Sequence, residues 1–93
     1  MKIELADVVI SINGRDAGKR FIVVWAKDEC SMIADGKGRR IEKPKLKKNK
    51  HLQFEDKAAG PVAEKLRENE RVSNNEIRRF LRNISDRGEE GGM

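Results

Sequence analysis

The sequence predicts a mainly β fold followed by an α-helical tail. Its first half contains several short β-branched segments separated by turn residues, which is typical of a small barrel or sandwich. After Phe54 the pattern changes to apolar residues at helical spacing. A chain of 93 residues fits one compact domain with an appendage. We therefore expect a β-barrel over residues 1–54, a helical tail over 55–87 and a disordered end over 88–93.

The first two strands have the clearest pattern. Residues 7–13 are rich in β-branched side chains, as expected of a strand. Alternate apolar residues share one face of it: Val8, Ile10 and Ile12. A glycine-containing loop, residues 14–19, then breaks the strand. Residues 20–26 are apolar at both odd and even positions. This pattern predicts a second strand that packs on the core with one face and is covered by other residues on its opposite face.

A hairpin should follow the second strand. Residues 30–34 form its first strand, and Asp35-Gly36 is a tight-turn signal because this pair supplies the positive φ that hairpins need. Residues 39–43 are expected to return as the next strand, which Pro44 ends. A short closing strand at residues 51–54 completes the set.

The tail is expected to hold two short helices, at about residues 61–70 and 74–84. Pro61 suits the first turn of the first helix. Ser73 and Glu76, three residues apart, form a capping box that starts the second. The second helix has one apolar face: Ile77, Phe80, Leu81 and Ile84. The pattern favours closure of the two helices on each other, and packing on the barrel or in a partner's groove are the alternatives.

The whole chain has a formal net charge of +5, and the positive charge is concentrated in its first half. Residues 1–53 hold 13 Lys/Arg and 7 Asp/Glu, a balance of +6, whereas residues 54–93 hold 8 and 9, a balance of −1. A concentrated positive field attracts phosphate backbones. Composition alone leaves nucleic-acid binding and a merely solubilising surface equally open.

The sequence carries no catalytic signature. Cys30 and His51 are the only residues of their kinds, and one of each cannot build a metal site of recognised spacing. We therefore expect a protein that is not an enzyme and that uses no metal and no cofactor. A single cysteine excludes an intrachain disulfide, and the longest apolar stretch is too short for a signal peptide or a membrane span. Both observations favour a cytoplasmic protein.

Five segments between residues 7 and 52 carry a resemblance to a known family: Val8-Val9-Ile10-Ser11, Gly14-Arg15-Asp16-Ala17-Gly18-Lys19, Ile22-Val23-Val24, Met32 to Pro44, and Lys50-His51-Leu52. In this order they resemble the KOW family of small SH3-like barrels. The resemblance is closest to its large-subunit ribosomal branch, typified by the archaeal and eukaryotic ribosomal protein numbered fourteen, and to bacterial KOW relatives. It implies an RNA-binding barrel that often works on ribosomal RNA. Trp25 departs from the family, which would have a small or aliphatic residue there.

The loop at residues 14–19 is the first candidate RNA contact. Two glycines, Gly14 and Gly18, permit φ values that other residues avoid and let a phosphate approach the backbone. Nearby cations add charge, and arginine can clamp a phosphate through two hydrogen bonds. These cations are Arg15, Lys19 and Arg20. From the residues alone a plain connecting loop is the simpler interpretation, and the family resemblance is what favours RNA contact.

The second candidate contact is a Lys/Arg-rich strip. Its members are Lys37, Arg39, Arg40, Lys43, Lys45, Lys47, Lys48 and Lys50. Arg39 and Arg40 follow a predicted rigid turn and are therefore better candidates than the loose lysines; a flexible solubilising segment is the alternative. Of the aromatic residues, Phe21 is expected in the core, whereas Trp25 suits either the core or a stacking platform for a base.

These features together predict a non-catalytic RNA-binding protein that contacts structured ribosomal RNA, or the large ribosomal subunit, mainly through phosphates. The alternative is a protein-interaction module that docks on translation or transcription machinery. In that interpretation the basic strip meets an acidic protein surface, and Trp25 or the tail helix supplies an apolar anchor.

Overall fold

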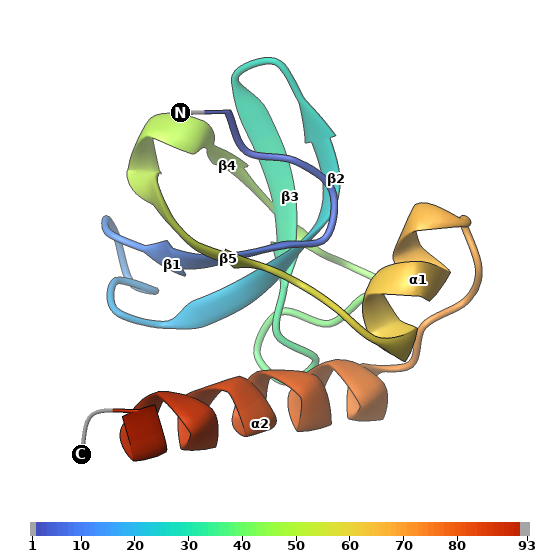
Figure 1. Ribbon diagram of the computed structural model, residues 1–93. Helices are drawn as coiled ribbons and strands as arrows, with labels where there is room; N and C mark the ends of the chain where they lie inside the picture. The colour runs from blue at the N-terminus through green and yellow to red at the C-terminus, as the bar shows by residue number, and fades with distance from the viewer. Residues whose placement is uncertain (1, 92–93) are drawn as a thin grey trace.

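The structure is a computed structural model that describes the backbone of residues 2–91 and the side chains through residue 84. It contains one antiparallel sheet of five strands, one turn of 3-10 helix and two α-helices (Figure 1). The elements are β1 (Asp7–Ser11), β2 (Arg20–Lys27), β3 (Cys30–Ala34), β4 (Lys45–Lys48), η1 (Asn49–His51), β5 (Leu52–Lys57), α1 (Pro61–Arg67) and α2 (Asn74–Gly91). The expected mainly β fold with a helical tail is confirmed.

The strands are arranged in the order β4-β3-β2-β1-β5. Strands β1 to β4 form a meander, and the chain then returns through η1 so that β5 pairs with β1. The sheet is strongly curled, as Figure 1 shows. Within residues 2–91, however, β4 and β5 do not pair with each other, so the sheet is open and not a closed barrel.

Both faces of the sheet are buried at its centre. Consecutive residues Val8 and Val9 of β1 are fully buried, although they point to opposite faces. The inner face carries one core: Ile3, Val9, Phe21, Val23, Ile33 and Leu52. The outer face shares a second core with the helices: Ala6, Val8, Ile22, Ala34, Ala58, Val62, Ala63, Val72, Ile77 and Leu81. The expectation that Phe21 is a core residue is confirmed.

The expected apolar face of the first strand is only partly present. Val8 is buried and Ile10 is half-buried, but Ile12 is 54% exposed and lies beyond the end of β1. Val8 pairs with Asp56 of β5, whereas the next residue, Val9, pairs with Phe54. Strand β5 therefore holds one extra residue at this point, which is a β-bulge. The sequence pattern of β1 gives no sign of this bulge, because the bulge arises in its partner strand.

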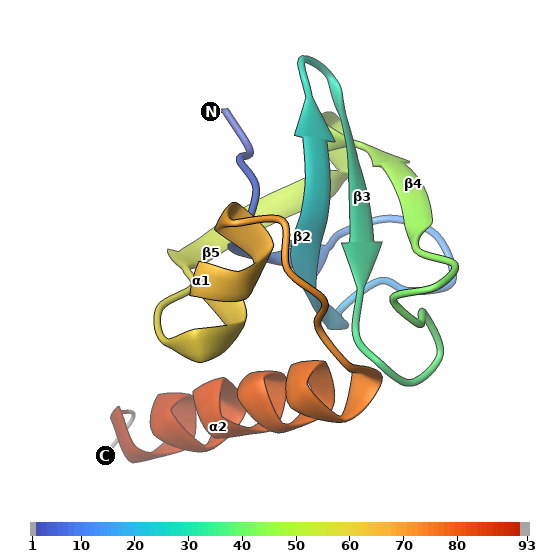
Figure 2. The ribbon, with the colours of Figure 1, turned by 90° about the vertical axis from the view of Figure 1, so that its right-hand side faces the viewer.

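The helical tail packs on the outer face of the sheet as well as on itself. Helix α2 contacts both β2 and α1. Figure 2 shows α2 crossing one end of the sheet, below α1 and against the loop that follows β3. The expected packing of the two helices on each other is therefore only part of what is observed. The outer face of the sheet is apolar, so the helices also bury this face.

The helix starts agree with the sequence better than the helix ends do. The capping box is confirmed: the Ser73 hydroxyl accepts a hydrogen bond from the Glu76 amide at 3.1 Å, and the Glu76 carboxylate accepts one from the Ser73 amide at 2.8 Å. Helix α1 ends at Arg67, three residues early, and Asn69 adopts a positive φ of 59° just after it.

Helix α2 continues to Gly91, so over residues 88–91 the structure differs from the expected disordered end. Extending a formed helix adds one hydrogen bond for each residue that becomes ordered, which makes elongation much easier than nucleation. The last two residues of that expected end, 92–93, lie outside the described residues.

The predicted strand at residues 39–43 was wrong, because the chain forms a loop there and the returning strand is β4. The Asp35 carboxylate accepts hydrogen bonds from the amides of Lys37 and Arg39, at 2.9 and 2.8 Å, and so closes a tight local turn. This turn keeps residues 36–44 out of the ladder until Lys45 pairs with Ile33.

The same loop receives the first turn of α2. Gly36 packs so closely on the helix that an added Cβ would lie 2.3 Å from the carbonyl oxygen of Asn74. The Asn74 amide group accepts a hydrogen bond from the Ile41 amide at 2.7 Å and donates one to Glu42 at 2.7 Å. Arg78 donates to the Gly36 carbonyl at 2.6 Å. These contacts fix α2 to the sheet.

We predict that Gly36→Ala lowers the free energy of unfolding by at least about 2 kcal/mol, since it adds a clash to a backbone that is at φ +76°. Urea denaturation followed by circular dichroism measures this change. Gly38→Ala is the matched control, because among the described residues an added methyl group there meets open space. Equal stability of the two variants would show that Gly36 does not hold the helix.

We also predict an acid-sensitive contribution from the second helix start. The Lys65 ammonium and then the Ser73 amide hold the pKa of Glu76 at about 2, below its ordinary value of 4.5. Because the folded-state pKa is depressed, this contribution is present above pH 4.5 and is lost as the pH falls towards 2. Glu76→Gln should flatten the fall in melting temperature across this window. Glu29→Gln, in the exposed β2–β3 turn, should leave it unchanged.

Candidate nucleic-acid interface

The two basic segments singled out by the sequence meet in the structure. Arg39, from the loop after β3, donates two hydrogen bonds to one carboxylate oxygen of Asp16 in the β1–β2 loop, at 3.1 and 2.9 Å. Asp16 is buried although it lies in an otherwise exposed loop. The ion pair therefore ties the glycine-containing loop to the basic strip across 23 residues of sequence.

Further lysines gather around this ion pair. Lys19 lies 3.8 Å from the Asp16 carboxylate. Lys47 donates a 2.7 Å hydrogen bond to the carbonyl of Asn13, at the start of the same loop. Lys45 and Lys47 share the inner face of β4, where they lie opposite Ile33 and Ser31. We call Lys19, Arg39, Lys45 and Lys47, which gather around the loop that holds Asp16, the basic cluster.

The central carboxylate stays ionised. Burial raises the pKa of Asp16, but the hydrogen bond from Arg39 and the charges of Arg39, Lys19 and Lys45 outweigh burial and hold the pKa below its ordinary value. One carboxylate cannot neutralise this many cations. Residues 12–19 and 35–51 together contain ten Lys/Arg and three Asp/Glu, a balance of +7 that exceeds the +5 of the whole chain.

The glycine positions have the predicted backbone geometry. Gly14 and Gly18 have φ values of 78° and 87°. The Gly18 amide donates to the Ser11 carbonyl at 2.7 Å, which folds the loop back on the end of β1. An added Cβ at Gly14 would lie 3.6 Å from the Lys47 ammonium group, so this backbone lies directly against the basic cluster.

The remaining predicted contacts are distributed more widely. Most are exposed: Arg15, Lys37, Lys43, Lys48 and Lys50. Arg20 instead donates to both oxygens of Glu55, one at 2.7 Å, and this hydrogen-bonded pairing raises the pKa of Arg20. Arg40 lies 3.5 Å from Glu42 and, unlike Arg39, makes no hydrogen bond to Asp16. Arg20 and Arg40 are thus not part of the cluster.

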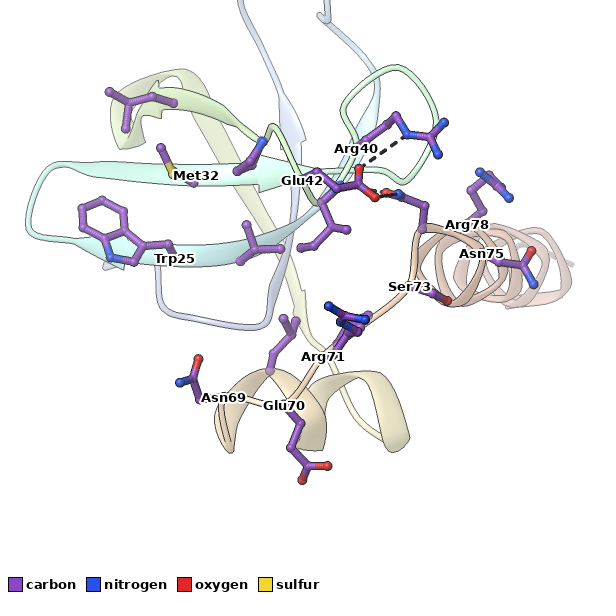
Figure 3. Close-up of a pocket in the computed structure, with 17 residues that line it drawn as sticks. Trp25, Met32, Arg40, Glu42, Asn69, Glu70, Arg71, Ser73, Asn75 and Arg78 are labelled. Carbon is purple, nitrogen blue, oxygen red and sulfur yellow. Dashed lines mark hydrogen bonds and ion pairs between the residues drawn. The ribbon is translucent and has the colours of Figure 1, made fainter.

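Two features of the structure were not foreseen from the sequence. Asp16 organises the cluster, and its signal was present as the one carboxylate within the loop from Gly14 to Lys19. The second feature is an apolar groove on the outer face of the sheet, of about 1330 Å³, drawn in Figure 3. Trp25 lines it because a register shift after Val23 moves Trp25 away from the inner core. In a regular strand Trp25 would share the face of Phe21, and the shift places it on the opposite face.

No protein-family model and no curated protein matches the chain. No helix in residues 2–91 combines the length and the hydropathy needed to cross a membrane. Among the described side chains, no group of three His, Cys, Asp or Glu residues is placed to hold a metal ion.

We predict that Asp16 and Arg39 are energetically coupled by about 1–3 kcal/mol. A double-mutant cycle of Asp16→Asn and Arg39→Gln, measured by urea denaturation, tests this coupling. The exposed pair of Arg40 and Glu42 is the control and should couple more weakly, because solvent screens exposed ion pairs. Additive effects of the Asp16 and Arg39 changes would show that the two loops are held together by other contacts.

Proposed function

We propose that this protein is a cytoplasmic, non-catalytic RNA-binding protein that contacts structured ribosomal RNA through its basic cluster. The observation that carries the proposal is the Asp16–Arg39 ion pair, because it gathers cations from two separate segments on one surface. Pre-ordered cations lose less conformational entropy when they bind phosphates than freely moving side chains do.

The exposed cations extend this surface in both directions. Arg15 and Lys37 lie in the two loops that the ion pair joins, and Lys50 lies in η1, just after β4. Cations spread over two loops and η1 suit a polyanion with many phosphates better than they suit a single small anion. Phosphate and shape contacts are favoured over base reading, since the chain has only four aromatic residues and Phe21 is buried.

The fold supports the same proposal. We infer that the curled five-stranded sheet is an open member of the SH3-like barrels and that the chain is related to the KOW family. Four of the segments that resemble that family form defined elements. They are β1, the β1–β2 loop that contains Asp16, β2, and β3 with the turn at Asp35. In this inference the tail from α1 onward is an addition that covers the outer face.

The first experiment is co-sedimentation of the tagged protein with ribosomal particles from its host, at low and at high salt. Migration with the large subunit, with release as salt rises, is the expected result, since phosphate contacts weaken with salt. Protein that stays at the top of the gradient at every salt concentration would contradict a ribosomal target.

A second experiment locates the interface. The slope of log affinity against log salt is negative for phosphate contacts. We predict that Lys19→Gln with Lys45→Gln makes this slope shallower by roughly 1.4 to 1.8, the value for two lost phosphate contacts. Affinity for host ribosomal RNA is measured by filter binding at several salt concentrations. Arg79→Gln with Arg82→Gln removes the same charge from exposed positions of α2 and should leave the slope unchanged. Equal slopes for the two double variants would place the RNA elsewhere.

A further inference from the structure

The outer face of the sheet carries an apolar row that the helices leave uncovered. Trp25 of β2 is paired with Met32 of β3, and Met32 is paired with Leu46 of β4. Trp25 is 45% exposed and Leu46 is 56% exposed. Among the described side chains only Ile12 is another large apolar group exposed to this degree. Three adjacent strands thus present one continuous apolar row to solvent.

The row forms the floor of the groove of about 1330 Å³. One wall of the groove is the segment between α1 and α2, which contributes Asn69, Arg71 and Val72. Figure 3 shows Trp25 and Met32 close together on the sheet, with Asn69 and Arg71 on the segment across from them. Exposed Trp and Met side chains in a groove are typical of surfaces that bind other proteins.

Cations border this row on both sides. Two residues beyond it on the same face lie Lys27 of β2 and Lys48 of β4, which are both paired with Cys30. The groove itself is also lined by Arg40, Arg71 and Arg78.

The carboxylates near the row are fewer or already engaged. Glu42 is bound to Asn74 and lies beside Arg40. In Figure 3 the Glu70 side chain points away from Trp25. Asp28 and Glu29 lie past Lys27, in the β2–β3 turn. The five cations named above therefore outnumber these four carboxylates around the apolar row.

We propose that this groove docks an acidic segment of a partner protein, anchored by apolar side chains on the row formed by Trp25, Met32 and Leu46. The apolar floor supplies the affinity, and the flanking cations select a partner of negative charge. This surface is separate from the RNA surface proposed above, because Lys45 and Lys47 lie on the opposite face of β4 from Leu46.

Two other occupants fit the groove less well. A second copy of the chain, packed face to face, would bring Lys27, Lys48 and Arg71 against the same cations, since such an interface uses the same patch twice. An unpaired RNA base would stack on Trp25, but Met32 and Leu46 form the rest of the floor and offer no aromatic plane.

Trp25 is itself the reporter for the test, because the chain has one tryptophan and no tyrosine. The probe is a displayed library of random 16-residue peptides, selected on the immobilised protein. Enrichment of acidic peptides with two or three apolar residues is the expected result. A selected peptide should then shift the Trp25 emission to shorter wavelength and reduce its quenching by acrylamide, since it covers the indole ring.

Two matched variants show whether binding occurs in the groove. Leu46→Glu should weaken binding of the selected peptide at least about tenfold, whereas Ile12→Glu, a similarly exposed position, should leave it unchanged. Loss of binding only in Leu46→Glu supports the proposal. Four results would overturn it: no enrichment, enrichment of basic peptides, equal behaviour of the two variants, or a Trp25 shift caused by ribosomal RNA. Sedimentation of the free protein as a dimer that Leu46→Glu dissociates would also overturn it, in favour of a second copy.

Discussion

Burial of both faces of a single sheet is the constraint on which the rest of this structure depends. Val8 and Val9 in β1, and Phe21, Ile22 and Val23 in β2, are fully buried at successive positions. Successive side chains of a strand point to opposite faces, so two separate cores are needed. Curling of the sheet closes the inner core, but a small sheet cannot cover its own outer face. The helical tail supplies that cover through a second apolar core, and is therefore an integral layer of the domain.

The loop between β3 and β4 connects this arrangement to the basic cluster. On one side, Gly36 and Ile41 receive the first turn of α2 through the Asn74 backbone and side chain. On the other side, Arg39 holds Asp16 and with it the β1–β2 loop. The turn that the Asp35 carboxylate closes lies between the two contacts. Helix docking and assembly of the basic cluster therefore depend on the conformation of the same loop. A change at the helix contact should alter the position of Arg39 as well.

Local signals determined how much could be predicted from the sequence. The strands β2 and β3, the Ser73–Glu76 capping box and the turn at Asp35 were all predictable, because each depends on neighbours within a few residues. The position of β4, the two register shifts and the Asp16–Arg39 pair were not, because each depends on which strands or loops meet in space. Trp25 illustrates the limit: a count of two from Val23 assigns it to the inner core, whereas one extra residue in the strand places it on the outer face.

Strand β4 separates two surfaces of different chemistry. Its side chains alternate, so that Lys45 and Lys47 join the basic cluster, whereas Leu46 lines the groove and Lys48 shares the face of Leu46. The strand is also an edge of the sheet, where lysines oppose pairing with a further strand from another chain. An edge protected in this way leaves recognition to side chains on the two faces. One short strand thereby keeps the basic and the apolar side chains apart, because they lie on opposite sides of the same backbone.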